Sequence, residues 1–390
     1  MNRILRQPSS YIAWPLLFAC GLTALAYDLP AGYLEGMLLL VMAAVGIILV
    51  DAFAAIRLPS IARFRARDYT GSREAFVALV FAAVVIVFCG LDLALFPIPL
   101  IDNPASYATM EPGREHVRHI SSLCWTLPPI GLLCTRNRGL RNALIMIGLV
   151  FPVLVIDRNR IFAALFSFVL VILFRRDVRR PLPWKAVGII GILGATVFSV
   201  LGAVRSGSLD NVKLPFSALY RASPQGIKWL ALYVSAGPYN FASMVTKGYT
   251  DAAILIGQLI PLSGPTTVAA AAIPFDASNI NVGTEFLPFL LAYGPWGAVA
   301  SMLLLYALLL WSVRRLRASV SLFSLLIFLR IAYVCLMSPF APQAFIWTNA
   351  AFVILCLLMQ LCAALLPTRR DSGTLPLPHE PHAWNKTRSI

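Results

Sequence analysis

The chain has 390 residues, of which 59% are hydrophobic and 13% are charged, and its formal net charge is +15. A soluble domain carries about a quarter charged residues, so this composition excludes a soluble globular protein. The positive charge lies between apolar runs, which is typical of the cytoplasmic loops of membrane proteins and argues against nucleic-acid binding.

Apolar runs recur along the chain, and a helix that crosses a bilayer needs roughly 20 mainly apolar residues. We predict an all-α polytopic membrane protein with one transmembrane domain over residues 1–366 and about ten spans. The polar, Pro-containing residues 367–390 are expected to form a disordered cytoplasmic tail. The predicted spans cover residues 11–27, 31–56, 74–96, 118–134, 140–156, 160–174, 186–203, 286–311, 319–337 and 346–366.

Basic residues mark every second connection between these spans, and this alternation predicts which side of the membrane each loop occupies. It places both chain ends in the cytoplasm and the long stretch 204–285 on the outer side. The basic positions are Arg57, Arg63, Arg65, Arg67, Arg73, Arg136, Arg138, Arg141, Arg175, Arg176, Arg179, Arg180, Lys185, Arg314, Arg315, Arg317, Arg369 and Arg370.

The outer stretch 204–285 contains two apolar segments of its own. Residues 226–245 are interrupted by Gly237-Pro238, so we predict a broken helix there. Residues 252–263 are too short to span and are expected to be interfacial or re-entrant. The alternative is that the two segments form a hairpin of further spans, which raises the count to twelve and leaves the orientation of the other spans unchanged.

Four arginines lie where the alternation does not expect positive charge. Arg158 and Arg160 are in a short outer turn, Arg205 follows the seventh span, and Arg330 is inside the ninth. Charges at membrane depth usually face a bundle interior or a water-filled cavity, and Arg offers a bidentate fork to phosphate oxygens. We therefore predict an anionic site at the outer end. The alternatives are that Asp157 pairs with Arg158, and that Arg205 and Arg330 extend to the interface.

Among the outer carboxylates, Glu285 is the candidate general base, because burial at the mouth of the eighth span would raise its pKa toward neutrality. The alternative is a solvated carboxylate at a helix start. His116 and His119 lie three residues apart, but no third ligand is indicated, so we expect no metal; a proton carrier or surface histidines are the other readings. Asp51 and Glu74, like Glu35, are expected to pair with arginines or reach the interface, the alternative being a proton relay.

The chain has no phosphate-binding glycine loop, no GxSxG and no nucleotide-binding domain, which excludes an ATP-driven pump on this chain. No cofactor is expected. Any donor substrate must then carry its own activation or arrive through the membrane.

Four segments resemble the Wzy-type O-antigen and exopolysaccharide repeat-unit polymerases. They are an Arg-led apolar span (157–174), an Arg-Ser/Gly stretch (204–210), a Tyr-rich segment ending in Asn-Phe (232–241) and an Asn-x-x-Thr stretch before a Gly-x-x-Gly span (279–298). One departure is Ala292-Tyr293-Gly294, where many members have Asp-Phe-Gly; any acidic role there is lost or moved to Glu285.

This resemblance implies a GT-C-like bundle with a large periplasmic loop (204–285) in the bacterial inner membrane. The donor is then a glycan on undecaprenyl diphosphate and the acceptor a new lipid-linked repeat unit, without a metal. Partners include membrane lipids, a chain-length regulator and a flippase. The resemblance assigns catalysis to Arg158, Arg160, Arg205 and Glu285, and substrate binding to Arg330, Tyr239, Asn240, Asn281 and Thr284.

Three alternatives remain. An O-antigen ligase performs related chemistry, but that family typically relies on a histidine in the periplasmic loop, and residues 204–285 contain none. A lipid-linked oligosaccharide flippase or transporter needs a cavity open to both sides in turn, whereas the unusual residues gather on the outer side. A structural subunit predicts that the outer arginines matter only for packing.

Overall fold

The computed structural model describes residues 6–54, 57, 68–102, 111, 113–175, 183, 185, 188–189, 191–196, 199–200, 209, 212–260, 273–277, 280, 282–318 and 320–367. Within them the regular elements are helices, and one isolated antiparallel bridge joins Tyr27 to Phe216. The helices are α1 (Ser9–Ala26), α2 (Tyr33–Ala54), α4 (Arg73–Leu95), α5 (Arg114–Ser121), the 3₁₀ helix η3 (Ser122–Thr126), α6 (Leu127–Cys134), α7 (Arg138–Leu154), α8 (Arg158–Arg175), α10 (Ala218–Ala222), α11 (Gln225–Lys247), α12 (Ala253–Leu259), α14 (Leu287–Ala318), α15 (Leu322–Met337) and α16 (Trp347–Leu365).

The protein is helical, as predicted, and five of the described helices are long and apolar enough to cross a membrane: α1, α2, α4, α14 and α16. Helix α15 is apolar but has 16 residues. The predicted span 118–134 is divided among α5, η3 and α6. The span predicted at 186–203 is described only in part, at 188–189, 191–196 and 199–200, and these residues are helical. The tail after Pro367 lies outside the described residues. The count of ten spans stays a prediction.

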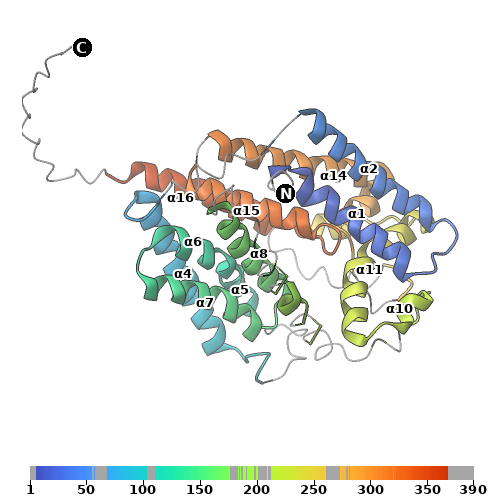
Figure 1. The fold of residues 1–390 in the computed structure, drawn as a ribbon, viewed down its shortest axis with the longest axis horizontal. Helices are drawn as coiled ribbons and strands as arrows, with labels where there is room; N and C mark the ends of the chain where they lie inside the picture. Colours follow the sequence, from blue (N-terminus) through green and yellow to red (C-terminus); the bar gives the residue numbers. More distant parts are fainter. Residues whose placement is uncertain are drawn as a thin grey trace, which may run out of the picture.

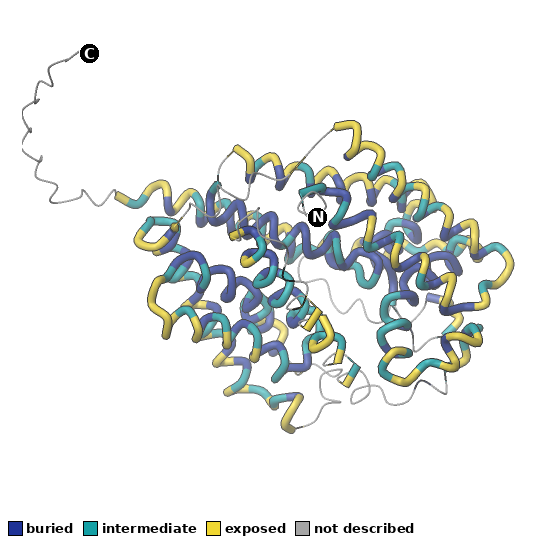
Figure 2. The backbone as a smooth tube through the Cα atoms, viewed as in Figure 1, coloured by how far each residue is buried: buried dark blue, intermediate teal, exposed yellow. Residues whose placement is uncertain are grey.

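Two groups of helices meet along α15, as Figure 1 shows. Helices α1, α2, α11 and α14 pack together on one side, and α4 to α8 with α16 on the other. Within α15, all of whose residues are described, only Arg330 and Leu336 are not fully buried. The buried helix runs through the centre of the bundle in Figure 2, as expected of a helix that is hydrophobic all round.

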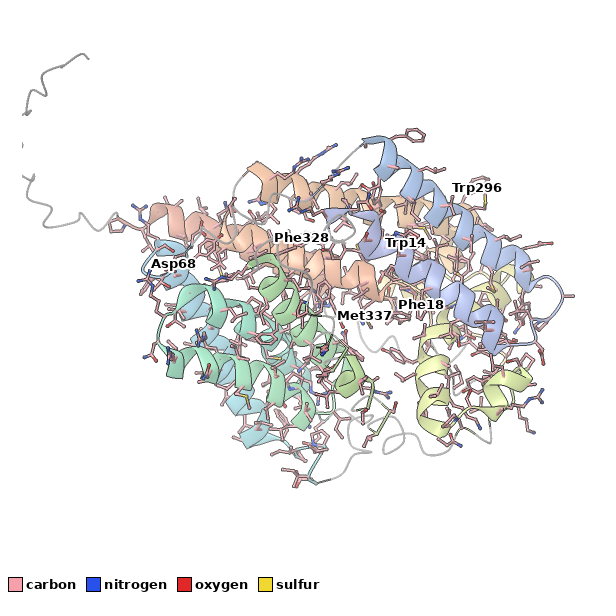
Figure 3. The ribbon with its side chains drawn as sticks, in the orientation of Figure 1. Trp14, Phe18, Asp68, Trp296, Phe328 and Met337 are labelled. Atoms are coloured by element: carbon pink, nitrogen blue, oxygen red, sulfur yellow. The ribbon has the colours of Figure 1, made fainter. Side chains whose placement is uncertain are left out.

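The surface of the bundle exposes large apolar side chains. Trp14 and Phe18 on α1 are 54% and 65% exposed, and Trp296 on α14 is 82% exposed. Figure 3 labels Trp14 and Phe18 on α1, and Phe328 on the central helix α15. Exposed apolar surface of this extent fits a protein whose surroundings are lipid.

Helix α11 is continuous across Gly237-Pro238, so the predicted break at that pair is wrong. The half of α11 that contains the pair is buried against α1, α2 and α14. A Cβ on Gly237 would overlap the carbonyl oxygen of Pro339 in the connection between α15 and α16. Glycine at this position therefore allows two chain segments to approach closely. Tertiary packing compensates for the backbone hydrogen bond that Pro238 cannot donate.

Two carboxylates, at the end of α2 and the start of α4, accept the first backbone N–H groups of other helices. Asp51 accepts from the backbone N–H of Ser9 (2.8 Å), and Glu74 accepts from that of Leu322 (2.8 Å). The first N–H groups of a helix have no partner within the helix, and they favour negative charge. Among the described residues neither carboxylate forms a salt bridge, so the predicted pairing of Asp51 and Glu74 with arginines is not seen.

Candidate functional site

A cavity of about 310 Å³ lies where the start of α8, the middle of α15 and the start of α16 meet η3 and α5. Helix α8 runs from the cavity to Arg175, and α16 runs from it to Leu365. Near this end of α16, the carbonyl of Ala364 accepts a hydrogen bond from Arg73. The cavity therefore lies at the end of the bundle opposite these basic residues. Its polar and aromatic lining includes His119, Trp125, Arg160, Arg330, Trp347 and Asn349.

Arg160 reaches the cavity from the first turn of α8. Its Nε lies 2.8 Å from Oδ2 of Asp157, and its backbone N–H donates to Oδ1 of the same carboxylate at 3.1 Å. Asp157 therefore both caps the start of α8 and pairs with Arg160. Arg158, which begins α8, is not among the residues that line the cavity.

Arg330 reaches the cavity from the middle of α15. Its Nε donates to Oδ1 of Asn349 on α16 at 2.6 Å, and its guanidinium lies 5.8 Å from the centre of the Tyr333 ring. Among the described residues no carboxylate forms a salt bridge with Arg330. Arg330 is therefore held by a neutral amide, whereas Arg160 is paired with the carboxylate of Asp157.

The two arginines are held in register by a contact between their helices. The hydroxyl of Tyr333, one turn after Arg330, lies 2.7 Å from the carbonyl oxygen of Asn159 and also contacts the side-chain oxygen of Asn159. Asn159 immediately precedes Arg160. The structure thus joins Arg160 and Arg330, which are 170 positions apart in the chain (330 − 160), in one cavity wall.

His119 lines the same cavity from α5 and is partly exposed. Its ring meets the ring of Trp347 edge-on, with 4.9 Å between centroids. His116 is more exposed and lies beside Glu115 at 3.9 Å. In the described part of the chain no group of three or more His, Cys, Asp or Glu is arranged to hold a metal ion.

Glu285 is buried and does not line the cavity. Its carboxylate accepts the backbone N–H groups of Gln343, of Ala344 (2.7 Å) and of Phe345 (3.1 Å). Burial raises the pKa of Glu285 to about 7, and the three N–H groups and Arg330 limit that rise. The carboxylate thus faces the connection between α15 and α16, and its role on substrate stays a prediction.

Tyr239 and Asn240, on α11, are buried and bonded within the chain. The Tyr239 hydroxyl donates to Asp276 at 2.8 Å, and its ring stacks on Tyr27 with 4.3 Å between centroids. The Asn240 amide donates to the carbonyls of Ile280 (2.8 Å) and Val282 (2.7 Å). These contacts hold the segment that leads to Glu285, away from the residues that line the cavity.

The remaining predicted residues are distributed as follows. Thr284 is fully buried, and its hydroxyl has no hydrogen-bond partner among the described residues. Arg205 and Asn281 lie outside the described residues. Of the residues predicted from sequence, the structure brings Arg160 and Arg330 into one cavity. Glu285 does not line the cavity but binds the α15–α16 connection beside it.

Sequence reasoning missed Asn349, Trp347 and Trp125, and it assigned His119 to no site. A signal for Asn349 is present, because it is a polar amide near the start of an apolar span. Nothing local in the sequence links it to Arg330, since the two residues belong to different helices.

Comparison with known proteins identified no matching family model, no matching curated protein and no matching solved structure. Function is therefore inferred from the cavity. Its two guanidinium groups suit a phosphate-containing ligand, its partly exposed imidazole can accept a proton, and its indole rings can pack against a sugar.

Proposed function

We propose that this protein is a membrane glycosyltransferase that polymerises undecaprenyl-diphosphate-linked repeat units into O-antigen or exopolysaccharide. The observation that carries the proposal is the presence of Arg160 and Arg330 in one cavity, at the end of the bundle opposite the basic residues. The proposal includes ten spans with both ends in the cytoplasm, which puts the cavity on the periplasmic side of the inner membrane.

In this reaction the acceptor hydroxyl oxygen forms a bond to the anomeric carbon of the donor glycan. The bond from that carbon to the diphosphate oxygen breaks, and undecaprenyl diphosphate leaves with the bonding electrons. Arg160 and Arg330 stabilise the negative charge that grows on the leaving group. The hydroxyl proton passes to a ring nitrogen of neutral His119, because Glu285 does not face the cavity and Asp157, which does, is paired with Arg160.

A second candidate is an O-antigen ligase, which transfers the finished glycan to lipid A core. His119 favours this candidate, because ligases typically rely on a periplasmic histidine. Residues 204–285 contain none, but His119 lies in the cavity with both arginines. The two functions differ in what accumulates when activity is lost.

The test replaces Arg160 or Arg330 by Ala in the host bacterium and displays surface polysaccharide on a gel. Arg315→Ala is the matched control, since Arg315 also donates to an amide of α16, that of Gln360 (2.6 Å), but away from the cavity. We expect polymer to fall roughly 100-fold or more in the two cavity variants and to persist in the control.

The form of the remaining glycan separates the candidates, provided that immunoblots show equal amounts of inserted protein. Single repeat units on lipid A core support a polymerase. Long chains that stay on undecaprenyl diphosphate support a ligase. Unchanged long-chain display in both cavity variants would contradict the proposal.

A further inference from the structure

We propose that Glu285 and Asn349 are positioning residues that fix the guanidinium of Arg330, so that its two terminal nitrogens are the ones offered to a diphosphate in the cavity. The inference rests on the proposed function in one respect, because it takes Arg330 as a cation that binds the anionic leaving group. Neither Glu285 nor Asn349 needs to touch the reacting atoms.

The first step is the attachment of the α15–α16 connection to Glu285. One carboxylate oxygen accepts from Gln343 and Ala344, and the other accepts from Phe345. Glu285 itself is tied to this connection a second time, since its backbone N–H donates to the carbonyl of Ser338 at 2.7 Å. Three consecutive N–H groups on one carboxylate set the direction of the carbonyl groups in the same peptides.

The second step is the orientation of the Asn349 side chain. Its Nδ2 donates to the carbonyl of Gln343 and to that of Ala344 (3.0 Å). Carbonyl oxygens only accept, so the amide must present its nitrogen to the connection and its oxygen to the other side. That oxygen is the acceptor for Arg330. Asn349 thus transmits the geometry of the connection to the guanidinium.

The third step is the choice of the guanidinium edge. Asn349 accepts the hydrogen bond from Nε of Arg330, and among the described residues neither terminal nitrogen of Arg330 has a hydrogen-bond acceptor. A guanidinium binds phosphate best through two parallel N–H donors, and the edge left for this is the one formed by the terminal nitrogens. Because Asn349 is neutral, it orients Arg330 without cancelling its charge, whereas Asp157 pairs directly with Arg160.

The arrangement also explains why the carboxylate of Glu285 can lie close to an anion site. Glu285 would repel a diphosphate if it faced the cavity, but its oxygens point at backbone N–H groups. Glu285 is 1% exposed. The carboxylate therefore supplies acceptors for the connection, whereas the charged lining of the cavity consists of Arg330 and of Arg160 with its partner Asp157.

The experiment measures the Kd of inorganic pyrophosphate for the full-length protein in nanodiscs by calorimetry. The variants are Arg330→Ala, Arg330→Lys, Asn349→Ala and Glu285→Gln, and Asn349→Ala is also combined with Arg330→Lys. Glu74→Gln is the matched control, since Glu74 also accepts a backbone N–H, that of Leu322, at the other end of α15. Thermal unfolding midpoints are recorded for every variant.

We expect Arg330→Ala to weaken binding at least tenfold and Asn349→Ala and Glu285→Gln to weaken it roughly tenfold, the equivalent of about 1.4 kcal/mol. Glu74→Gln should bind as the wild type does. Lysine has a single terminal ammonium and no two-nitrogen edge for Asn349 to orient, so Asn349→Ala should cause no further loss in the Arg330→Lys background. A general structural effect would instead weaken binding equally in both backgrounds.

The outcomes separate this inference from the proposed function. If Arg330→Ala binds pyrophosphate as the wild type does, the cavity is not the anion site and the proposed function fails. If Arg330→Ala weakens binding but Asn349→Ala does not, the proposed function stands and the positioning role is overturned. Should Glu285→Gln fail to insert, the cycle between Asn349 and Arg330 still decides the positioning role.

Discussion

At the scale of single residues, three carboxylates of this protein accept backbone N–H groups where helices begin. Asp51 does so at α1, Glu74 at α15 and Glu285 just before α16. An N–H group is a partner that needs no second charge in a region where unpaired charges are expensive. Glu285 differs from the other two in that its acceptors serve three consecutive N–H groups beside a cavity.

The pKa of Glu285 predicts how stability depends on pH. Because burial raises this pKa from 4.5 to about 7, the contribution of the group to stability is complete below pH 4.5 and is lost as the pH rises to about 7. The loss amounts to roughly 3–4 kcal/mol, at about 1.4 kcal/mol per pKa unit. Thermal unfolding of the detergent-solubilised protein between pH 4.5 and 8 should show the wild type losing stability relative to Glu285→Gln. Parallel curves for the two proteins would contradict this.

At the scale of elements, α11 packs against the α15–α16 connection, and this contact helps to position the residues after the connection that line the cavity. Gly237 brings the α11 backbone against Pro339, a few residues before the peptides that Glu285 holds. Asp276 ties another connection to α2 and α11 through Tyr33 (2.7 Å), Tyr239 (2.8 Å) and Lys247 (2.6 Å). Loops at this end of the bundle are thus fastened to helices by polar contacts as well as by packing.

The close approach at Gly237 predicts the effect of a single methyl group. In Gly237→Ala the Cβ would overlap a backbone carbonyl, which cannot rotate away as a side chain can, so we expect a loss of about 1–3 kcal/mol of stability. The measurement is the unfolding midpoint by fluorescence-detected size-exclusion chromatography. Gly46→Ala in α2 is the control, since nothing lies within 4 Å of its Cβ position and Ala favours a helix. Equal midpoints for the two variants would refute the packing role of Gly237.

At the scale of the whole molecule, the surface and the charge distribution predict how the protein sits in a membrane. Apolar side chains such as Trp14 and Trp296 cover the outside, and the cavity lies at the end opposite the basic residues. The positive-inside pattern then puts Glu115 on the outer side and Arg136 in the cytoplasm. Both are well exposed, with side chains 60% and 80% accessible.

Thiol labelling on intact cells tests this orientation. The described cysteines are buried except Cys362, so Cys362→Ser gives a suitable background. In it, we expect Glu115→Cys to react with a membrane-impermeant maleimide and Arg136→Cys to react only after the cells are opened. A C-terminal green fluorescent protein should fluoresce, as it does in the cytoplasm. The reverse labelling pattern would invert the predicted topology and move the cavity to the cytoplasmic side.

Sequence alone determined that this protein is helical and apolar, because hydropathy and the spacing of charges are properties of contiguous segments. It also singled out Arg160 and Arg330, since a charge beside or within an apolar run is visible without a fold. It missed the continuity of α11, because Gly237-Pro238 predicts a break from local propensity, whereas burial on three helices decides the outcome.

Only the tertiary structure decided that Arg160 and Arg330 share one cavity, and that Glu285 binds the α15–α16 connection and does not line the cavity. The chain of contacts from Glu285 through Asn349 to Arg330 joins α15, α16 and the segment before α14. No pattern within one segment encodes it, because each partner is chosen by how helices pack and which way their side chains point. The site is therefore a property of the packed bundle, because its residues come from segments that lie far apart in the sequence.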